Sequence, residues 1–403
     1  MLMNKKKKVA VVSKLRFPEF KCTGEWKVTQ LNVLADKVTT RNKDNLIARV
    51  LTNSAVEGVI DQSDYFNREV ANPNNLENYF IIEENDYVYN PRISVTAPVG
   101  PISKNKVGKG VMSPLYTVFR FKNYHNDFYE QYFKTPLWHD YIKSISNTGA
   151  RHDRISISND NFMRMPLPYS SESEQQKIAD CLITLDKLIT AEDYKLEALK
   201  THKKSLMQKL FPTDGETVPE WRFPEFRDSG NWEGRKLGDV CTSIFSGKSK
   251  KSIEKGSFPL IGSTGQIGFC DTADYSGELI LIARVGANAG QVNFYSGDCG
   301  VSDNTLILNV NTEYVIGLFL RKWLENFNVN KLTFGSGQPL VTGRQLRNID
   351  ICIPQLTEQH KIADCLSTLD TRIMVQAKKI ETLKIHKKGL MQGLFPSINE
   401  VNG

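Results

Sequence analysis

Several glycine-containing segments of this 403-residue chain combine small polar side chains with lysine or arginine, a composition that suits contact with a phosphate backbone. Glycine lets backbone N–H groups approach a phosphate closely, and lysine supplies the counter-charge. Arginine, glutamine, asparagine and serine can hydrogen-bond base edges in the major groove of DNA. Any one such loop is more often an ordinary solvated turn, so only their number in each half favours a nucleic-acid surface. The candidate DNA-contacting residues are Arg92, Lys104, Lys106, Lys109, Arg151, His152 and Arg154 in the first half, and Ser246, Lys248, Lys250, Lys251, Ser263, Thr264, Gln266, Arg284, Asn288, Ser336, Gln338 and Arg344 in the second.

Motifs that carry catalysis or hold a metal ion are not found in the sequence. Ser246–Ser249 lacks the upstream glycine of a nucleotide-binding GxxxxGK[ST] loop, and Asn90–Arg92 only partly echoes an amino-methyltransferase motif. None of the 6 histidines forms HExxH, and no GxSxG or Cys/His spacing marks a nucleophile. The 7 cysteines include no CxxC pair, which predicts reduced, mostly buried thiols. We therefore expect a binding module with no catalytic residues, no metal site and no cofactor of its own.

Composition narrows the class of protein further. A hydrophobic content of 40% with 24% charged residues is typical of a soluble globular protein, and the length favours two domains. The net charge of +7 agrees with a polyanionic partner without proving one. No apolar run approaches the ~20 residues that span a bilayer, and the apolar stretch after the first lysines is too short for a signal peptide. We expect a cytoplasmic protein with no membrane partner.

Two sequence frames occur twice in the chain. Leu15–Phe20 returns as Trp221–Phe226, sharing Arg-Phe-Pro-Glu-Phe, and a tryptophan follows each copy. Glu174–Leu182 returns almost unchanged as Glu358–Leu366, and this echo continues without a gap to a Leu-Phe-Pro in each copy. The interval between the two frames is about twenty residues shorter in the second copy, and its contents are poorly alike. Similar frames around dissimilar contents indicate one scaffold that serves two recognition tasks.

Apolar residues in the longer echo recur at alternating steps of four and three, the pattern of a coiled-coil seam. Polar residues interrupt the seam at the same places in both copies, at Glu192 and Gln376 and again at Lys203 and Lys387. Such insertions cost stability but fix register. The alternative, in which each helix packs only on its own head, fits less well because one compact head cannot cover so long a stripe. The expected seam residues are Ile178, Leu182, Leu185, Ile189, Leu196, Leu199, Leu206, Ile362, Leu366, Leu369, Ile373, Ile380, Leu383 and Leu390.

Chain connectivity sets the direction of the two helices. Each would be roughly 38 residues and about 57 Å long at ~1.5 Å per residue. The second head begins where the first helix ends and finishes where the second helix begins. Parallel helices would force that head to span the whole length, whereas antiparallel helices bring its two ends together. We therefore expect an antiparallel coiled coil with pseudo-two-fold symmetry and a head at each end.

The heads contain strand-like runs punctuated by glycine and asparagine, such as Tyr79–Ile82. Helices are expected around Phe128–Ser144 and Tyr314–Asn326, and Arg92–Gly100 sits where Arg284–Gly290 does. We expect each head to be a strand-rich, mixed α/β (α+β) domain. The predicted boundaries are a basic tail at 1–14, heads at 15–170 and 213–355, helices at 171–212 and 356–396, and a C-terminal tail at 397–403.

The chain resembles the specificity (S) subunits of Type I restriction–modification systems over nearly its whole length. The most specific elements are the repeated Glu-Gln-x-Lys-Ile-Ala that begins at Glu174 and Glu358, the Lys203–Phe211 segment with its copy at Lys387, and the paired Arg-Phe-Pro-Glu-Phe. Gly335–Pro354 looks like the end of a family target-recognition domain. The matching stretch of the first half, Gly149–Pro168, departs from that pattern.

The resemblance implies that each head reads one half of a split DNA site, while the helices set the spacer and dock two methyltransferase subunits. Those subunits would use S-adenosylmethionine and flip the target adenine. Restriction (motor–nuclease) subunits that use ATP and magnesium would complete the complex, and this chain would be non-catalytic. Two alternatives remain open: a scaffold whose heads bind other proteins, and a nuclease or methyltransferase with unrecognised motifs.

Overall fold

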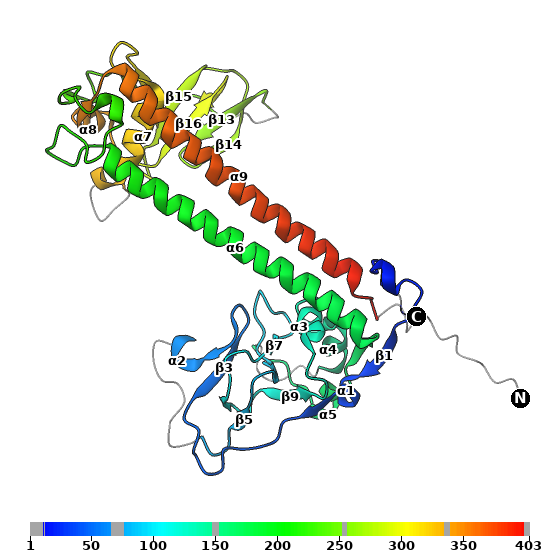
Figure 1. Ribbon diagram of the computed structural model, residues 1–403. Coiled ribbons are helices and arrows are strands. Elements are labelled where there is room, and N and C mark those ends of the chain that lie inside the picture. Colours follow the sequence, from blue (N-terminus) through cyan, green and yellow to red (C-terminus); the bar gives the residue numbers. More distant parts are fainter. Residues whose placement is uncertain are drawn as a thin grey trace, which may run out of the picture. The chain divides into compact units, whose positions relative to one another are not determined.

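The computed structural model describes residues 11, 13–65, 76–146, 153–251, 256–333 and 339–398. The chain divides into two compact units, Met1–Ala191 with Ile380–Gly403, and Glu192–Lys379. Unit 1 contains head 1 (residues 11–170) and unit 2 contains head 2 (residues 213–355), each with the adjoining parts of two long helices (Figure 1). None of the helices in these ranges combines the length and the apolar character that a membrane span requires.

The two long helices are α6 (Glu172–Leu210) and α9 (Leu356–Leu394). Acidic residues occupy the first turn of each helix, where their negative charge interacts favourably with the helix dipole. A proline lies two residues after the end of each helix. Every expected seam residue is buried or half-buried, whereas the exposed apolar residues of the helices lie at other positions. The repeated stripe is therefore the packed face of both helices.

Contacts within each unit give the helix direction. In unit 1, Lys387 of α9 binds Asp186 of α6, and Leu394 packs in the same cluster as Ile178. In unit 2, Lys203 lies 2.6 Å from Asp370, and the earlier residue Glu192 accepts a hydrogen bond from the later residue Gln376 at 2.7 Å. Rising numbers in α6 thus meet falling numbers in α9 in both units, so the helices pair antiparallel. The polar residues that interrupt the seam are therefore all bonded: Glu192 and Gln376 bond each other, and Lys203 and Lys387 each bind an aspartate.

The two heads share one strand topology despite their dissimilar sequences. Each has a four-stranded antiparallel sheet and a second sheet that contains one parallel strand pair. In head 1 the antiparallel sheet has the strand order β2 (Ala35–Lys37), β9 (Thr117–Phe121), β6 (Tyr87–Tyr89), β7 (Ile102–Lys104). The second sheet of head 1 has the order β4 (Gly58–Asp61), β3 (Val50–Ser54), β8 (Gly110–Met112), β5 (Phe80–Ile82). In head 2 the antiparallel sheet has the strand order β12 (Cys241–Ser246), β18 (Thr305–Val310), β15 (Glu278–Ala283), β16 (Val292–Ser296). The second sheet of head 2 has the order β14 (Gly265–Cys270), β13 (Phe258–Gly262), β17 (Gly300–Val301).

The difference in length between the heads lies mostly in one connection. Residues 62–86 join β4 to β6 in head 1 and include α2 (Gln62–Tyr65) and the additional strand β5. Residues 271–277 make the corresponding connection from β14 to β15 in head 2. This insertion explains why the repeated frames are further apart in the first copy.

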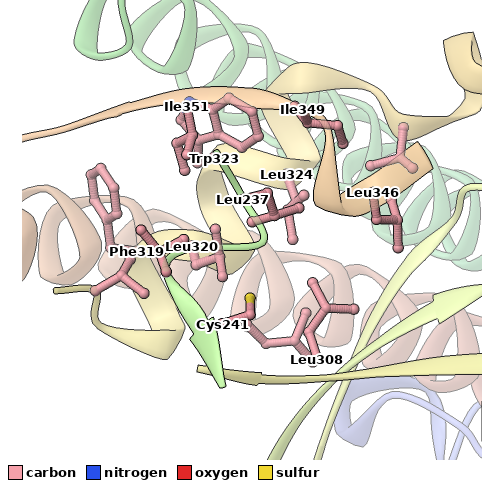
Figure 2. Packing of buried hydrophobic residues seen from close by; sticks show 14 of the residues in the cluster. Leu237, Cys241, Leu308, Phe319, Leu320, Trp323, Leu324, Leu346, Ile349 and Ile351 are labelled. Carbon is pink, nitrogen blue, oxygen red and sulfur yellow. The ribbon is translucent and has the colours of Figure 1, made fainter. Parts of the chain in front are cut away.

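Short helices cover the sheets and differ in places from the expected ones. The helix expected over Phe128–Ser144 is two helices, because Pro136 has no N–H to donate and breaks it. In head 2, α7 carries the expected apolar face, and Figure 2 shows Phe319, Leu320 and Trp323 packed with Ile351. The short helices are α1 (Leu31–Leu34), α3 (Asp127–Phe133), α4 (His139–Ile145), α5 (Asn159–Met163), α7 (Gly317–Phe327), α8 (Gly343–Arg347) and the 3-10 turns η1 (Pro18–Phe20), η3 (Pro224–Phe226) and η4 (Val329–Leu332).

A two-stranded ribbon joins the entrance and the exit of each head. In head 1, β1 (Lys27–Gln30) pairs antiparallel with β10 (Pro166–Tyr169). In head 2, β11 (Glu233–Lys236) pairs with β19 (Asp350–Ile353). Both ends of a head therefore lie together, next to the start of the long helix that follows it in the chain.

The Arg-Phe-Pro-Glu-Phe segments attach each head to both long helices. In unit 1, Arg16 donates through Nε and Nη2 to the two carboxylate oxygens of Glu174, at 2.6 and 2.8 Å. The neighbouring N–H of Leu15 donates to the carbonyl of Gly393 near the end of α9, at 2.8 Å. In unit 2, Arg222 makes the same bidentate contact with Glu358 at 2.7 Å for both bonds, and Trp221 N donates to Lys209 O at 2.9 Å. Each segment thus joins the start of one helix to the end of the other.

The tail boundaries drawn from the sequence need correction. Val11 is buried, pairs with Trp26 in an isolated bridge and belongs to the core of unit 1. Ile398, expected in the C-terminal tail, packs in the same core. Most of the expected basic tail lies outside the described residues.

A charged cluster fixes each head on the helix pair. In unit 2, Lys322 of α7 is almost fully buried and binds Asp370, which also binds Lys203. In unit 1, the repeat-equivalent Asp186 lies 3.6 Å from Lys134 and also binds Lys387. Burial raises the pKa of Asp370, but hydrogen bonds from Lys203 and Lys322 outweigh it, so its pKa lies below the ordinary value.

We predict that Asp370→Asn destabilises the protein by about 2 kcal/mol at neutral pH, because buried Lys322 loses a charged acceptor. A depressed pKa in the folded state contributes stability above the unfolded pKa, and this contribution is lost as pH falls through the folded value. The difference between wild type and variant should therefore shrink below about pH 4, in urea titrations from about pH 7 to pH 3. Asp186→Asn is the matched control and should cost less, since Lys134 is 43% exposed. If Asp370→Asn and Asp186→Asn lowered the free energy of unfolding equally at all pH values, the role assigned to Asp370 would be contradicted.

Candidate nucleic-acid interface

The best-formed candidate surface is an extended rib in head 2, residues 247–250, which continues from β12. Gly247 N donates to Thr305 O and Ser249 N donates to Val301 O, both at 2.9 Å. Alternate residues therefore face opposite sides: Gly247 and Ser249 are buried, while Lys248 and Lys250 are exposed. The following residue, Lys251, is exposed too. The rib presents lysine ammonium groups to solvent from a backbone that is itself fixed.

The small residues of the rib are required by its close packing. A Cβ at Gly247 would lie 2.3 Å from the carbonyl oxygen of Val301, so no other residue fits without a backbone shift. The hydroxyl of Ser249 donates to Asp274 and accepts the N–H of Val301 at 3.1 Å. This serine holds the rib in place, and sequence reasoning missed it because Asp274 is distant in the chain.

Hydrogen bonds bring the other predicted loops of head 2 to the rib. Arg284 Nη1 donates to the hydroxyl of Ser246 at 3.3 Å, and the carbonyl of Arg284 accepts the N–H of Val341 at 2.8 Å. Gly286 N donates to Pro339 O at 3.1 Å. Asn293 of β16 donates to the carbonyl of Ser263 at 3.2 Å. Segments far apart in sequence therefore form one end of head 2.

The remaining predicted residues of head 2 fall into three groups. Thr264 and Gln266 are exposed at the β13–β14 turn, and Arg344 is exposed in the first turn of α8. Asn288 is half-buried in the loop that follows Arg284. Ser336 and Gln338 lie outside the described residues.

The lysines predicted in head 1 form ion pairs instead of a free basic loop. Lys104 is buried in β7 and binds Asp127 at 2.6 Å, so it is not available to a phosphate. Sequence reasoning erred there because burial by α3 is a tertiary effect. Lys106 and Lys109 are more than half exposed, but they pair with Glu130 at 2.7 Å and Glu83 at 3.1 Å.

The arginines predicted in head 1 lie in the loop equivalent to that of Arg284 in head 2 and in the segment opposite it. Arg92 and Arg154 are partners in an isolated bridge and share Asp153 at 3.9 Å each. Ile155 N donates to Pro91 O in head 1 as Val341 N donates to Arg284 O in head 2. The hydrogen-bond register therefore matches Arg284 with Pro91, one residue before the expected Arg92. Arg151 and His152 lie outside the described residues.

Head 1 has no lysine rib at the equivalent edge within its described residues. Val38 N donates to Val118 O at 2.9 Å, the counterpart of Gly247 with Thr305, and the next residues pair with β5. Arg41 there forms a bridge with Phe80, places its guanidinium 5.5 Å from that ring and donates to Asn78 O. In head 1 the inserted strand β5 therefore pairs with the segment that corresponds to the rib of head 2.

The described residues give little support for a metal site or for a reactive cysteine. The described ranges hold no group of three or more histidine, cysteine or acidic side chains placed to bind a metal ion. All seven cysteines are free, and burial raises the pKa of the Cys241 thiol to about 12. Burial also raises the pKa of Cys299, to about 11. Such thiols are protonated and unreactive at neutral pH.

Comparison with known proteins finds a family model that matches one part of the chain and similar proteins that cover most of it. Residues 229–384 match the model of the Type I restriction modification DNA specificity domain. The Type I restriction enzyme MjaVIII specificity subunit of Methanocaldococcus jannaschii is 25% identical over 326 residues, which cover 71% of this chain and 74% of that protein. The crystal structure of the S subunit of a Type I restriction–modification system from M. genitalium has the same fold, with a TM-score of 0.63 at 15% identity, covering 96% of this chain and 100% of that one.

A second solved chain, from work on complex assembly and conformational transition of the type I R-M system, has a TM-score of 0.57 at 15% identity, covering 92% of this chain and 97% of that one. The repeated frames, the antiparallel helix pair and the two strand-rich heads are thus accompanied by a matching domain model and relatives of one kind. Residues 229–384 belong to the Type I restriction modification DNA specificity domain family, and over most of its length the chain is similar to specificity subunits of Type I systems.

Proposed function

We propose that each head of this chain reads one half of a bipartite DNA site, and that head 2 contacts the phosphate backbone through Lys248, Lys250 and Lys251. The lysine rib carries this proposal. Its backbone is hydrogen-bonded and its ammonium groups face solvent, and among the described residues neither Lys248 nor Lys250 forms an ion pair. Neutralising phosphates releases condensed counterions, which is the main source of sequence-independent affinity for DNA.

Sequence reading requires groups that reach base edges next to such phosphate contacts. Arg284, Thr264, Gln266 and Arg344 are exposed or half-exposed on elements of head 2. Arginine and glutamine can make bidentate contacts with guanine and adenine in the major groove. In head 1 the loop equivalent to that of Arg284 carries Arg92, and Arg154 lies opposite it in an isolated bridge.

The long helices act as a spacer between the half-sites and dock two methyltransferase subunits in this proposal. Within each unit the seam includes polar residues whose bonds fix the register of the two helices, as a ruler of constant length requires. S-adenosylmethionine would bind to the methyltransferase subunits, and ATP and magnesium to the restriction subunits. This chain would bind none of them.

The purified chain alone should leave DNA unmethylated, whereas the chain with its methyltransferase subunit should methylate adenine at one split sequence. The reason is that the chain supplies recognition and the partner supplies the chemistry. Transfer of labelled methyl groups to duplex DNA, followed by mapping of the methylated positions, measures both. Equal methylation by the chain alone would overturn the proposal.

Lys248→Ala combined with Lys250→Ala should weaken DNA binding by the reconstituted complex at all sequences alike. Loss of two phosphate contacts should lower the slope of log affinity against log salt by about 2. The matched control is Lys177→Ala with Lys361→Ala, two lysines of the long helices that are 53% and 52% exposed. An effect confined to one base pair would mean that the rib reads bases instead of phosphates.

A seven-residue insertion after both Thr190 and Met374 should lengthen the tolerated gap between half-sites by about 3 base pairs. Seven helical residues add about 10 Å and preserve the phase of the seam. The methylated sequence of each half should stay the same. An insertion in one helix alone, the control, should abolish activity because the seam residues lose their partners. An unchanged gap in the double insertion would refute the ruler.

A further inference from the structure

One loop occupies the same place in both heads but differs in length and in its tip. It joins the central strand of the four-stranded sheet to the edge strand, as residues 91–100 in head 1 and 284–290 in head 2. Both copies bridge to the segment that leads out of the head, through Arg92 with Arg154 and Val285 with Leu340. Both end in a glycine with positive φ, Gly100 at 80° and Gly290 at 88°. We call these copies the tip loops.

The tip loop of head 1 is longer and carries a tight turn, Ser94–Ala97. Ser94 N donates to Ala97 O at 3.0 Å, and Ala97 N donates to the hydroxyl of Ser94 at 3.1 Å. The hydroxyls of Ser94 and Thr96 lie 3.1 Å apart. Ala97 and Val99 anchor the base of the turn because both are buried. The turn is thus fixed by its own hydrogen bonds and by packing beneath it.

Val95 stands at the tip of this turn with a relative exposure of 102%, the highest among the exposed large hydrophobic residues of the described chain. A single exposed apolar residue is ordinary on a protein surface. Here, however, the residue is branched and stiff, and the turn keeps it from folding back onto the protein. The same loop carries the exposed side chain of Arg92, three residues earlier in the sequence. A loop that carries both an apolar tip and a cation is suited to a groove that offers both methyl groups and phosphates.

We propose that Val95 is a specificity-determining residue that contacts the 5-methyl group of a thymine in the major groove of the half-site read by head 1. This proposal rests on the proposed function, since it needs head 1 to read DNA. The thymine methyl is the apolar feature of the major groove, and small aliphatic side chains recognise it by contact. In head 2 the shorter tip loop places Ala287 at its exposed position, so the same scaffold presents a different tip to a different sequence.

Uracil in place of thymine tests the contact, because it removes the methyl group and keeps the base pair. In the complex reconstituted with methyltransferase subunits, each thymine of both half-sites is replaced in turn and binding is measured. One replacement, in one half-site, should weaken wild-type binding about fourfold, the effect of one buried methyl group. Val95→Ala should weaken binding to the thymine duplex by a similar factor and should be insensitive to uracil at that position.

Val33→Ala is the matched control, because Val33 is also exposed, at 59%, but lies on α1 next to the entrance ribbon. This variant should bind like wild type and keep the full sensitivity to uracil. The proposal is overturned if Val95→Ala binds the thymine duplex as wild type does, or if it responds to every uracil as wild type does. In either case the wild-type complex still methylates its split site, whereas absence of specific methylation by wild type would refute the proposed function itself.

Discussion

The bidentate pair between an arginine of the Arg-Phe-Pro-Glu-Phe segment and the first glutamate of the repeated helix motif holds each unit together. Glu174 and Glu358 are both 1% exposed, and a buried carboxylate is tolerated only when its charge is paired and its oxygens are bonded. Arg16 meets this need with two parallel bonds, and a third N–H binds Gly24 O at 2.6 Å. Lysine cannot supply this planar fork. The same geometry recurs at Arg222, so the motif must repeat wherever a head joins the helix pair.

The heads are free to diverge because their topology depends on backbone pairing and not on particular side chains. Seven strands of the two larger sheets have counterparts in both heads, in the same order and with the same parallel pair, although the sequences are poorly alike. Several of these strands are buried on both faces, as β6 and β15 are, and a short run of apolar residues of many kinds is enough to bury such a strand. Connections at the sheet edges can therefore change length, as the β4–β6 connection does, without disturbing the frame. Recognition surfaces that consist of such connections can vary while the attachment stays constant.

The contrast between the constant attachment of the heads and their variable connections also explains which features could be predicted from the sequence. The seam could be read from it because a stripe from Ile178 to Leu206 repeats every 3.5 residues and has to be buried. The antiparallel direction followed from chain connectivity alone. Lys104 was misjudged because only the fold reveals that Asp127 of α3 covers it. Ser249 was missed for the same reason, since its partner Asp274 is brought to it by the sheet. Local patterns reveal periodic burial, whereas a site assembled from distant segments requires the fold.

The inserted strand β5 has a consequence for how the heads divide affinity and selectivity. It pairs with the edge of head 1 that corresponds to the lysine rib of head 2, and Arg41 there is engaged with Phe80. Lys106 and Lys109 are also paired with carboxylates, so fewer of their charges are free to replace counterions on DNA. If both heads bind with useful strength, head 1 must take a larger share of its binding free energy from base contacts, which depend little on salt. Raising salt should then weaken contacts with the half-site of head 2 first, an asymmetry that follows from the different loops on one shared frame.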